Sequence, residues 1–242
     1  MLTESEQRRR LAAAFRWSAR LGFNEAVANH FSALVPGSDH EFLLNPRGAH
    51  FSRITASSLV RLDANSAGGP ADDRADPTAW FLHAHLHRLV PHAKVILHTH
   101  MPYATALACL DGFELQMLDQ SSCRFFGPVA YDRKFGGMFL DDSEGPRLAA
   151  LLADGVSTVF LGNHGVMVVG ASVAEAFDDL YYLERVCELH VLAMSTGRPL
   201  ALIPDDIAAL TCRQWLDYPE GPELHLRAVM DILDDEEPQY AE

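Results

Sequence analysis

Segments with helical spacing of apolar residues alternate along this chain with short segments rich in β-branched and aromatic residues. The first helix is predicted at residues 4–21, where Leu11 and Phe15 lie on one face and Gly22 provides a stop signal. The longest helix is predicted at residues 173–195. These two helices bracket most of the predicted strands.

A further helix has a clear start at Asp76, which is a typical N-cap residue. Pro77 fits the first helical turn, and Pro91 ends the run. Shorter helices are predicted at residues 102–110 and 144–153.

Six short segments have the composition of strands. They are residues 31–35, 42–44, 94–100, 125–130, 157–161 and 165–169. Because strands and helices intermingle over the first 200 or so residues, the pattern predicts an α/β or α+β fold in one domain over residues 1–242. From about residue 200 we expect a helical tail that ends in a disordered acidic stub.

The charge balance argues against two classes of partner. The formal net charge is −14, which disfavours binding to nucleic acid or to an anionic membrane. Much of the acidity is clustered, and we expect it to form a solvated surface at Asp72-Asp73, Asp141-Asp142, Asp178-Asp179 and Asp234-Asp235-Glu236-Glu237. The acidic residues of the helix at 173–195 are likewise expected on a solvated or subunit-facing surface.

Three further observations predict a cytoplasmic protein. No apolar run approaches the roughly 18 residues that a membrane-spanning helix needs, and the polar N-terminus predicts no signal peptide. The four cysteines are widely spaced and show no CxxC pattern, which is typical of reduced thiols.

Histidines are the unusual feature of the composition, because there are 12 of them and they cluster. His98 and His100 lie two residues apart in a predicted strand, so both side chains point to one face, roughly 6–7 Å apart. His164 lies between two predicted strands in a glycine-flanked turn. Three histidines with an open coordination position are typical of a catalytic metal site.

A competing pair of metal ligands lies on the helix that follows Asp76. His83 and His87 are four residues apart and therefore share a helix face. Histidines beside Trp80 and Phe81 more often serve packing, so we favour the first set and keep His83 as a group that orients a ligand or transfers a proton.

The run from Phe81 to Leu107, which includes His98-Thr-His100, resembles the central stretch of the class II aldolase and adducin family. Asn163-His164-Gly165 resembles the turn that carries that family's third metal ligand, and the similarity covers roughly residues 8–200. The resemblance implies a three-layer α/β/α fold around a mixed, largely antiparallel sheet. It also implies one divalent metal per subunit and a homotetramer with sites at subunit interfaces. In the aldolases, the metal stabilises an enediolate during retro-aldol cleavage.

Several positions depart from the family pattern. The catalytic glutamate of the sugar-phosphate aldolases is replaced by Ala79, which cannot transfer a proton. The two phosphate-binding loops are altered, and their counterparts contain the substrate-binding candidates Asn29, His30, Arg47 and Gly48. The planar guanidinium of Arg47 suits a carboxylate, so we expect an acidic substrate. The sequence, including residues 119–126 and 131–137, is similar to a branch of the family that contains pyridine-dicarboxylate decarboxylases and some iron-dependent oxygenases.

These features predict a metal-dependent carbon–carbon lyase, either a decarboxylase or an aldolase, for a small carboxylate-bearing or hydroxy-carbonyl substrate. We expect zinc at the site, with manganese, iron or cobalt as alternatives. His83 and Tyr131 are the predicted proton donors. The alternatives are a non-haem iron oxygenase that uses the same three histidines and a non-catalytic, adducin-like interaction module.

Overall fold

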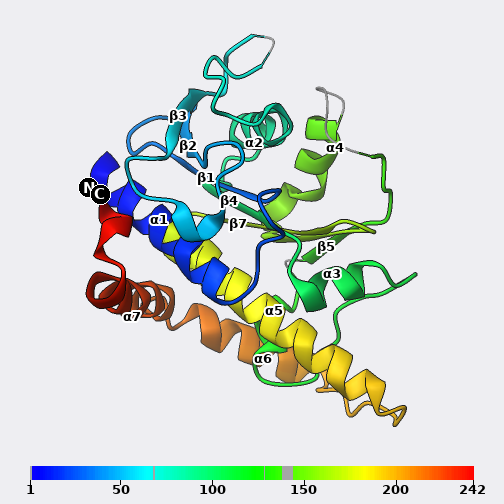
Figure 1. Cartoon of the computed structure of the whole chain (residues 1–242). Helices are drawn as coiled ribbons and strands as arrows, with labels where there is room; N and C mark the ends of the chain where they lie inside the picture. The colour runs from blue at the N-terminus through cyan, green and yellow to red at the C-terminus, as the bar shows by residue number, and fades with distance from the viewer. Residues whose placement is uncertain (1, 68, 128, 138–143) are drawn as a thin grey trace.

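A seven-stranded sheet forms the middle layer of the computed structural model, and helices pack on both of its faces (Figure 1). The structure describes residues 2–67, 69–127, 129–137 and 144–242. The strand order is β3-β2-β1-β4-β7-β6-β5, and within these residues only the β5–β6 pair is parallel. The bounds are β1 (His30–Leu34), β2 (Glu41–Leu44), β3 (Val60–Asp63), β4 (Val95–Thr99), β5 (Val129–Asp132), β6 (Thr158–Leu161) and β7 (Gly165–Gly170). The expected α/β/α architecture with a mixed, largely antiparallel sheet is confirmed.

Three helices, α1 (Glu4–Arg20), α3 (Pro102–Ala108) and α5 (Val173–Ser195), cover one face of the sheet (Figure 1). Phe15 of α1 packs in an aromatic group with Phe31 and Phe51, with ring centroids 4.6–4.9 Å apart. Burial of such rings supplies much of the hydrophobic stabilisation of this layer. None of the described helices is long and apolar enough to span a bilayer.

The opposite face is covered by α2 (Pro77–Leu89) and α4 (Glu144–Leu151). Side chains of β4 alternate between the two layers, so that Leu97 packs toward α5 while Ile96 packs toward α2 and α4. The same alternation places His98 on the face that α2 covers.

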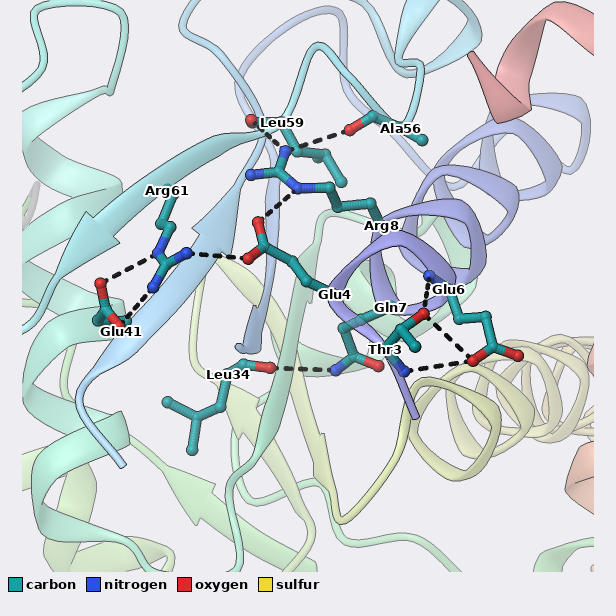
Figure 2. A network of polar contacts seen from close by, with 10 residues as sticks. All are labelled: Thr3, Glu4, Glu6, Gln7, Arg8, Leu34, Glu41, Ala56, Leu59 and Arg61. Carbon is teal, nitrogen blue, oxygen red and sulfur yellow. Dashed lines mark hydrogen bonds and ion pairs between the residues drawn. The ribbon is translucent and has the colours of Figure 1, made fainter. Parts of the chain in front are cut away.

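Polar contacts at the N-terminal end of α1 attach this helix to neighbouring segments of the same chain (Figure 2). The guanidinium of Arg8 donates to the carbonyl oxygens of Leu59, at 2.8 Å, and Ala56, at 3.3 Å. The amide of Gln7 donates to the carbonyl oxygen of Leu34 at 3.2 Å. These bonds connect the helix to β1 and to the segment that leads into β3.

The edge strand β3 (Val60–Asp63) was not predicted from the sequence. It contains only two buried positions that alternate with two exposed ones, too little for a recognisable periodicity. On its solvent side, Arg61 forms ion pairs with Glu41 at 2.6 Å and Glu4 at 2.9 Å (Figure 2). A charged residue on an edge strand disfavours pairing with another chain.

The C-terminal tail forms two helices, α6 (Asp205–Leu216) and α7 (Gly221–Glu236). The expectation of a disordered acidic stub is wrong, because Tyr240 is completely buried and its hydroxyl donates to Asp234 at 2.8 Å. Arg16 and Arg20 of α1 form ion pairs with the acidic end of α7 and the residue after it. Nearer the start of α1, the guanidinium of Arg9 lies over the ring of Tyr240, and the two ends of the chain lie close together (Figure 1).

The expectation that the acidic residues of α5 lie on a solvated surface is also wrong for several of them. Asp178 is buried, and Arg124 donates to both Asp178, at 2.6 Å, and Asp179, at 2.9 Å. The Glu184 carboxylate accepts the first two backbone N–H groups of α3, at 2.8 and 2.9 Å. Each group therefore has a structural partner. The predicted surface pair Asp141-Asp142 lies outside the described residues.

The burial of Tyr240 predicts that the end of the chain stabilises the fold. Tyr240→Ala should lower the free energy of unfolding by about 3–5 kcal/mol, since it leaves a cavity the size of an aromatic ring. Tyr218→Ala, at a half-exposed position of the same tail, is the matched control and should change it by about 0.5 kcal/mol or less. Urea denaturation measures both, and equal effects would show that the tail does not pack as described.

Candidate metal centre

Three imidazole rings from neighbouring strands converge at one end of the sheet. His98 belongs to β4, His100 follows its last residue, and His164 lies in the turn between β6 and β7. The ring centroids are 5.0 Å apart for His98 and His100 and 4.8 Å apart for each other pair. One nitrogen of each ring lies within 4.8 Å of the others. Three neutral imidazoles at this separation suit a single divalent cation.

The turn reaches the two other histidines because of its local backbone. Asn163 adopts a left-handed conformation with φ of +57°, which asparagine tolerates better than most residues. A Cβ atom on Gly165 would lie 2.5 Å from the carbonyl oxygen of Thr99 and 2.8 Å from the ring of His100. Only glycine therefore permits this close approach.

Hydrogen bonds orient two of the rings for ligation. Nδ1–H of His98 donates to the carbonyl oxygen of Val166 at 2.9 Å, and Nδ1–H of His100 donates to the carboxylate of Glu25. Each bond leaves Nε2 as the unprotonated nitrogen. Nε2 of His100 is buried and has no hydrogen-bond partner, which is unfavourable unless a cation binds there. The donor set therefore fits a divalent metal, with outer partners typical of such sites.

Burial favours the neutral form that ligates metals for His98 and His164. It lowers the pKa of His98 well below its usual value, and the neighbouring His30 ring lowers it further. Burial, with a smaller effect of His100, lowers the pKa of His164 to about 4. At neutral pH, protons therefore compete weakly for the ligand nitrogens of His98 and His164.

The competing pair on α2 is arranged differently. His83 Nδ1 lies 2.5 Å from the hydroxyl of Ser32, and its Nε2 lies 2.7 Å from Nδ1 of His30. His87 contacts the same hydroxyl at 2.8 Å and the carbonyl oxygen of Ala93 at 2.9 Å. All four ring nitrogens thus take part in hydrogen bonds, and His83 is completely buried rather than facing a ligand.

The predicted substrate-binding residues lie at different distances from the three rings. His30 is adjacent to them, because it pairs with His98 across β1 and β4 and its ring centroid is 4.9 Å from that of His98. Asn29 is buried, and its Oδ1 accepts the N–H of Glu25 at 2.6 Å. Its Nδ2 has no hydrogen-bond partner.

Arg47 and Gly48 lie in the turn after β2. The Arg47 side chain is exposed, and its Nε is 3.6 Å from the carboxylate of Asp76, the N-cap of α2. Gly48 has a φ of +74°, which the turn requires. Burial lowers the pKa of His30 to about 3, and the negative charge of Asp76 opposes this shift.

Tyr131 is not brought to the three rings within one chain. It packs with the core on the α5 side of the sheet, where its ring stacks on Phe160 at 5.5 Å. Its hydroxyl accepts the backbone N–H of Leu115 at 2.8 Å. His98 lies on the opposite face, so strand alternation separates the two groups.

Two residues of the site were missed in the sequence. Glu25, the partner of His100, lies in a loop 75 positions earlier, and no local pattern identifies it. Ser32 lies two residues after His30 on the same strand face, so the alternation of β1 could have indicated it.

The family model described as "Class II Aldolase and Adducin N-terminal domain" matches residues 9–191. A putative aldolase class 2 protein of Pseudomonas aeruginosa is 36% identical over 82% of this chain and 76% of its own length. The decarboxylase NovR of Streptomyces niveus is 32% identical over 85% of this chain and 76% of its own. A 4-hydroxy-3-prenylphenylpyruvate oxygenase/4-hydroxy-3-prenylbenzoate synthase of Streptomyces roseochromogenus is 30% identical over 85% of this chain and 74% of its own.

Solved structures show the same architecture. An aldolase II superfamily protein from Pseudomonas syringae superimposes with a TM-score of 0.89 at 33% identity, covering 100% of this chain and 97% of the other. The L-fuculose 1-phosphate aldolase from Glaciozyma antarctica gives a TM-score of 0.83 at 25% identity, covering 98% and 92%.

The hydrogen bond between His100 and Glu25 predicts a contribution to metal affinity. Glu25→Gln should weaken zinc binding about tenfold or more, because an amide oxygen is a poorer acceptor for Nδ1–H than a carboxylate. Competition with a chelator of known affinity measures the change. Glu220→Gln, at an exposed position outside the site, is the control, and an equal affinity for both variants would contradict the assignment.

Proposed function

Because the chain belongs to the class II aldolase and adducin family, we propose that it is a metal-dependent carbon–carbon lyase, either a decarboxylase or an aldolase. The substrate is a small carboxylate-bearing or hydroxy-carbonyl compound. The observation that carries this proposal is the convergence of His98, His100 and His164, with a buried and unpartnered Nε2 on His100. The cation is zinc in this proposal, with manganese, iron or cobalt as alternatives.

A divalent cation at this site supplies a Lewis acid that stabilises negative charge as it develops on a substrate oxygen. The protein contributes the orientation of the ligand rings through Val166 and Glu25. Arg47 provides a guanidinium for a substrate carboxylate, because its side chain is exposed and its contact with Asp76 is long, at 3.6 Å.

Ala79 favours decarboxylation over aldol cleavage in this proposal. It lies in the first turn of α2, buried in an apolar cluster that includes Trp80, and its methyl group transfers no proton. Decarboxylation needs no base to start carbon–carbon cleavage, whereas a retro-aldol reaction does. The similarity to a protein named a decarboxylase supports the same choice.

A non-haem iron oxygenase is the second candidate. Three imidazole ligands serve iron as well as zinc, and one of the similar proteins is named an oxygenase. The two candidates differ in their need for oxygen.

We also propose that the protein works in the cytoplasm as a homotetramer with sites at subunit interfaces. The supporting feature is a group of exposed apolar side chains toward the C-terminal end of α5 and on α6, namely Leu189, Leu192, Met194, Ile207, Leu210 and Leu216. In this proposal, these exposed side chains become buried at contacts between subunits.

The lyase proposal predicts a metal requirement without an oxygen requirement. Protein reconstituted with zinc should bind about one ion per chain and release carbon dioxide or an aldehyde from a panel of small hydroxy and keto acids under anaerobic conditions. Chelation should abolish turnover, and metal should restore it. His164→Ala should lose the bound ion, whereas His40→Ala, at the surface, should retain it.

Two experimental outcomes would contradict the proposed lyase function. Turnover that needs both iron and oxygen would favour the oxygenase. Absence of metal affinity would favour a non-catalytic, adducin-like module.

The assignment of Arg47 predicts a specific kinetic effect. Arg47→Ala should raise KM for a carboxylate substrate about tenfold with a smaller change in kcat, because a charged hydrogen bond to the bound substrate is lost. Arg74→Ala removes a nearby exposed arginine that pairs with Asp72 and should leave KM unchanged. Equal kinetics for both variants would remove Arg47 from the site.

A further inference from the structure

A chain of hydrogen bonds beneath the metal centre is not used by the proposed reaction. It begins at the carbonyl oxygen of Ala93 and passes to His87 at 2.9 Å, then to Ser32 at 2.8 Å. From Ser32 it continues to His83 at 2.5 Å and ends at His30 after a further 2.7 Å. His83, His87 and Ser32 are buried, and only His30, at the end of this series of bonds, is partly exposed.

The carbonyl oxygen determines the direction of the first bonds. A carbonyl only accepts, so Nδ1 of His87 carries the proton and its Nε2 accepts from the hydroxyl of Ser32. The hydroxyl has one proton, so it must accept from Nδ1–H of His83. Nε2 of His83 is then unprotonated and accepts from Nδ1–H of the next ring.

This order holds if His83 and His87 are neutral, and their surroundings favour that form. Burial lowers the pKa of His83 well below its usual value and that of His87 to about 4. Within the described residues, no carboxylate forms a hydrogen bond with either ring. A charged imidazolium without an acidic partner is unfavourable in such a place.

The last ring is the one beside the metal centre. His30 uses Nδ1 for the bond to His83, and none of the described residues forms a hydrogen bond with its Nε2. Asp76, whose charge acts on this ring, is bonded to the backbone N–H groups of Thr78 and Ala79. The ring lies 4.9 Å from that of His98 between centroids.

We propose that this chain of bonds fixes His30 as a hydrogen-bond acceptor, so that the substrate presents a hydroxyl group to its Nε2. Naming that ligand a substrate rests on the proposed lyase function. Ser32, His83 and His87 are positioning residues that act through His30. A carboxylate would place its own lone pairs against Nε2, so the hydrogen bonding supports a hydroxy acid or hydroxy-carbonyl compound with its carboxylate elsewhere.

The first test reads the proton positions without turnover. Protein labelled with ¹⁵N-histidine is examined by long-range ¹H–¹⁵N correlation, with and without zinc. His30, His83 and His87 should all carry the proton on Nδ1, which is the less common form of free imidazole. An Nε2–H form of His30 in the wild-type protein would overturn the proposal, whatever the variants do.

Variants then test whether the hydroxyl of Ser32 couples the proton position of His87 to those of His83 and His30. Ser32→Ala should leave His87 protonated on Nδ1, because Ala93 is unchanged, but should release His83 and His30 from that form. Ser32→Thr should restore it through the retained hydroxyl. Ser122→Ala removes another buried serine hydroxyl, bonded only near residue 119, and should leave all three rings unchanged. No change at His30 in Ser32→Ala would contradict the coupling.

The second test measures the preference for a hydroxyl donor. Zinc-loaded protein should bind glycolate about tenfold more tightly than methoxyacetate, which lacks the donor hydrogen. Ser32→Ala should reduce that ratio, and Ser122→Ala should not. Equal affinity for the two acids would overturn the inference. Correct proton positions in a protein without lyase activity would count against the proposed function alone.

Discussion

The antiparallel pairing of β4 with β7 brings the three proposed ligand histidines together. Thr99 pairs with Val166 at the end of this ladder, so the turn before β7 must cross beside His100. The close approach of Gly165 to the backbone of Thr99 leaves no space for a side chain. A larger residue there would separate the strands and move His164 away from its partners, because backbone atoms cannot yield as a flexible side chain can.

Backbone carbonyls orient imidazoles at two separate places around this ladder. Val166 accepts the proton of His98, and Ala93 accepts the proton of His87. A buried ring must satisfy both nitrogens or lose free energy, and a carbonyl can satisfy only the protonated one. In each case the other nitrogen is left as an acceptor. Nε2 of His98 faces the proposed cation. Nε2 of His87 accepts from the hydroxyl of Ser32, and this bond fixes which nitrogen of His83, and then of His30, carries the proton.

The sequence predicted those parts of the molecule that depend on local pattern. The N-cap at Asp76 and the long helix α5 follow from residues close together in the chain. The pair His98 and His100 was recognisable for the same reason, since strand geometry alone places both side chains on one face. His164 joins them only through the pairing of β4 with β7. In the sequence, its glycine-flanked turn between two predicted strands was the signal, and the family resemblance strengthened it.

The sequence was least informative for residues whose structural role depends on a partner far away in the chain. Clustered acidic residues suggest a solvated surface, yet Arg124 and the arginines of α1 bind many of them. Tyr131 stays a predicted proton donor, and within one subunit the alternation of β5 directs it to the α5 side of the sheet. Glu25 carries no local signal, because its role exists only in the tertiary contact with His100.

The proposed difference from the sugar-phosphate aldolases concerns the start of α2. Ala79 and His83 lie four residues apart and so share a helix face, but the first packs among apolar side chains and the second is enclosed by Ser32 and His30. Neither position of α2 presents a polar atom to a ligand. In the proposed site, the polar atom that contacts a ligand belongs to β1 rather than to α2. It is Nε2 of His30, whose ring is held by a series of hydrogen bonds. A hydrogen-bonding group held in this way has a fixed direction, and selectivity for a hydroxyl donor follows from that direction rather than from charge.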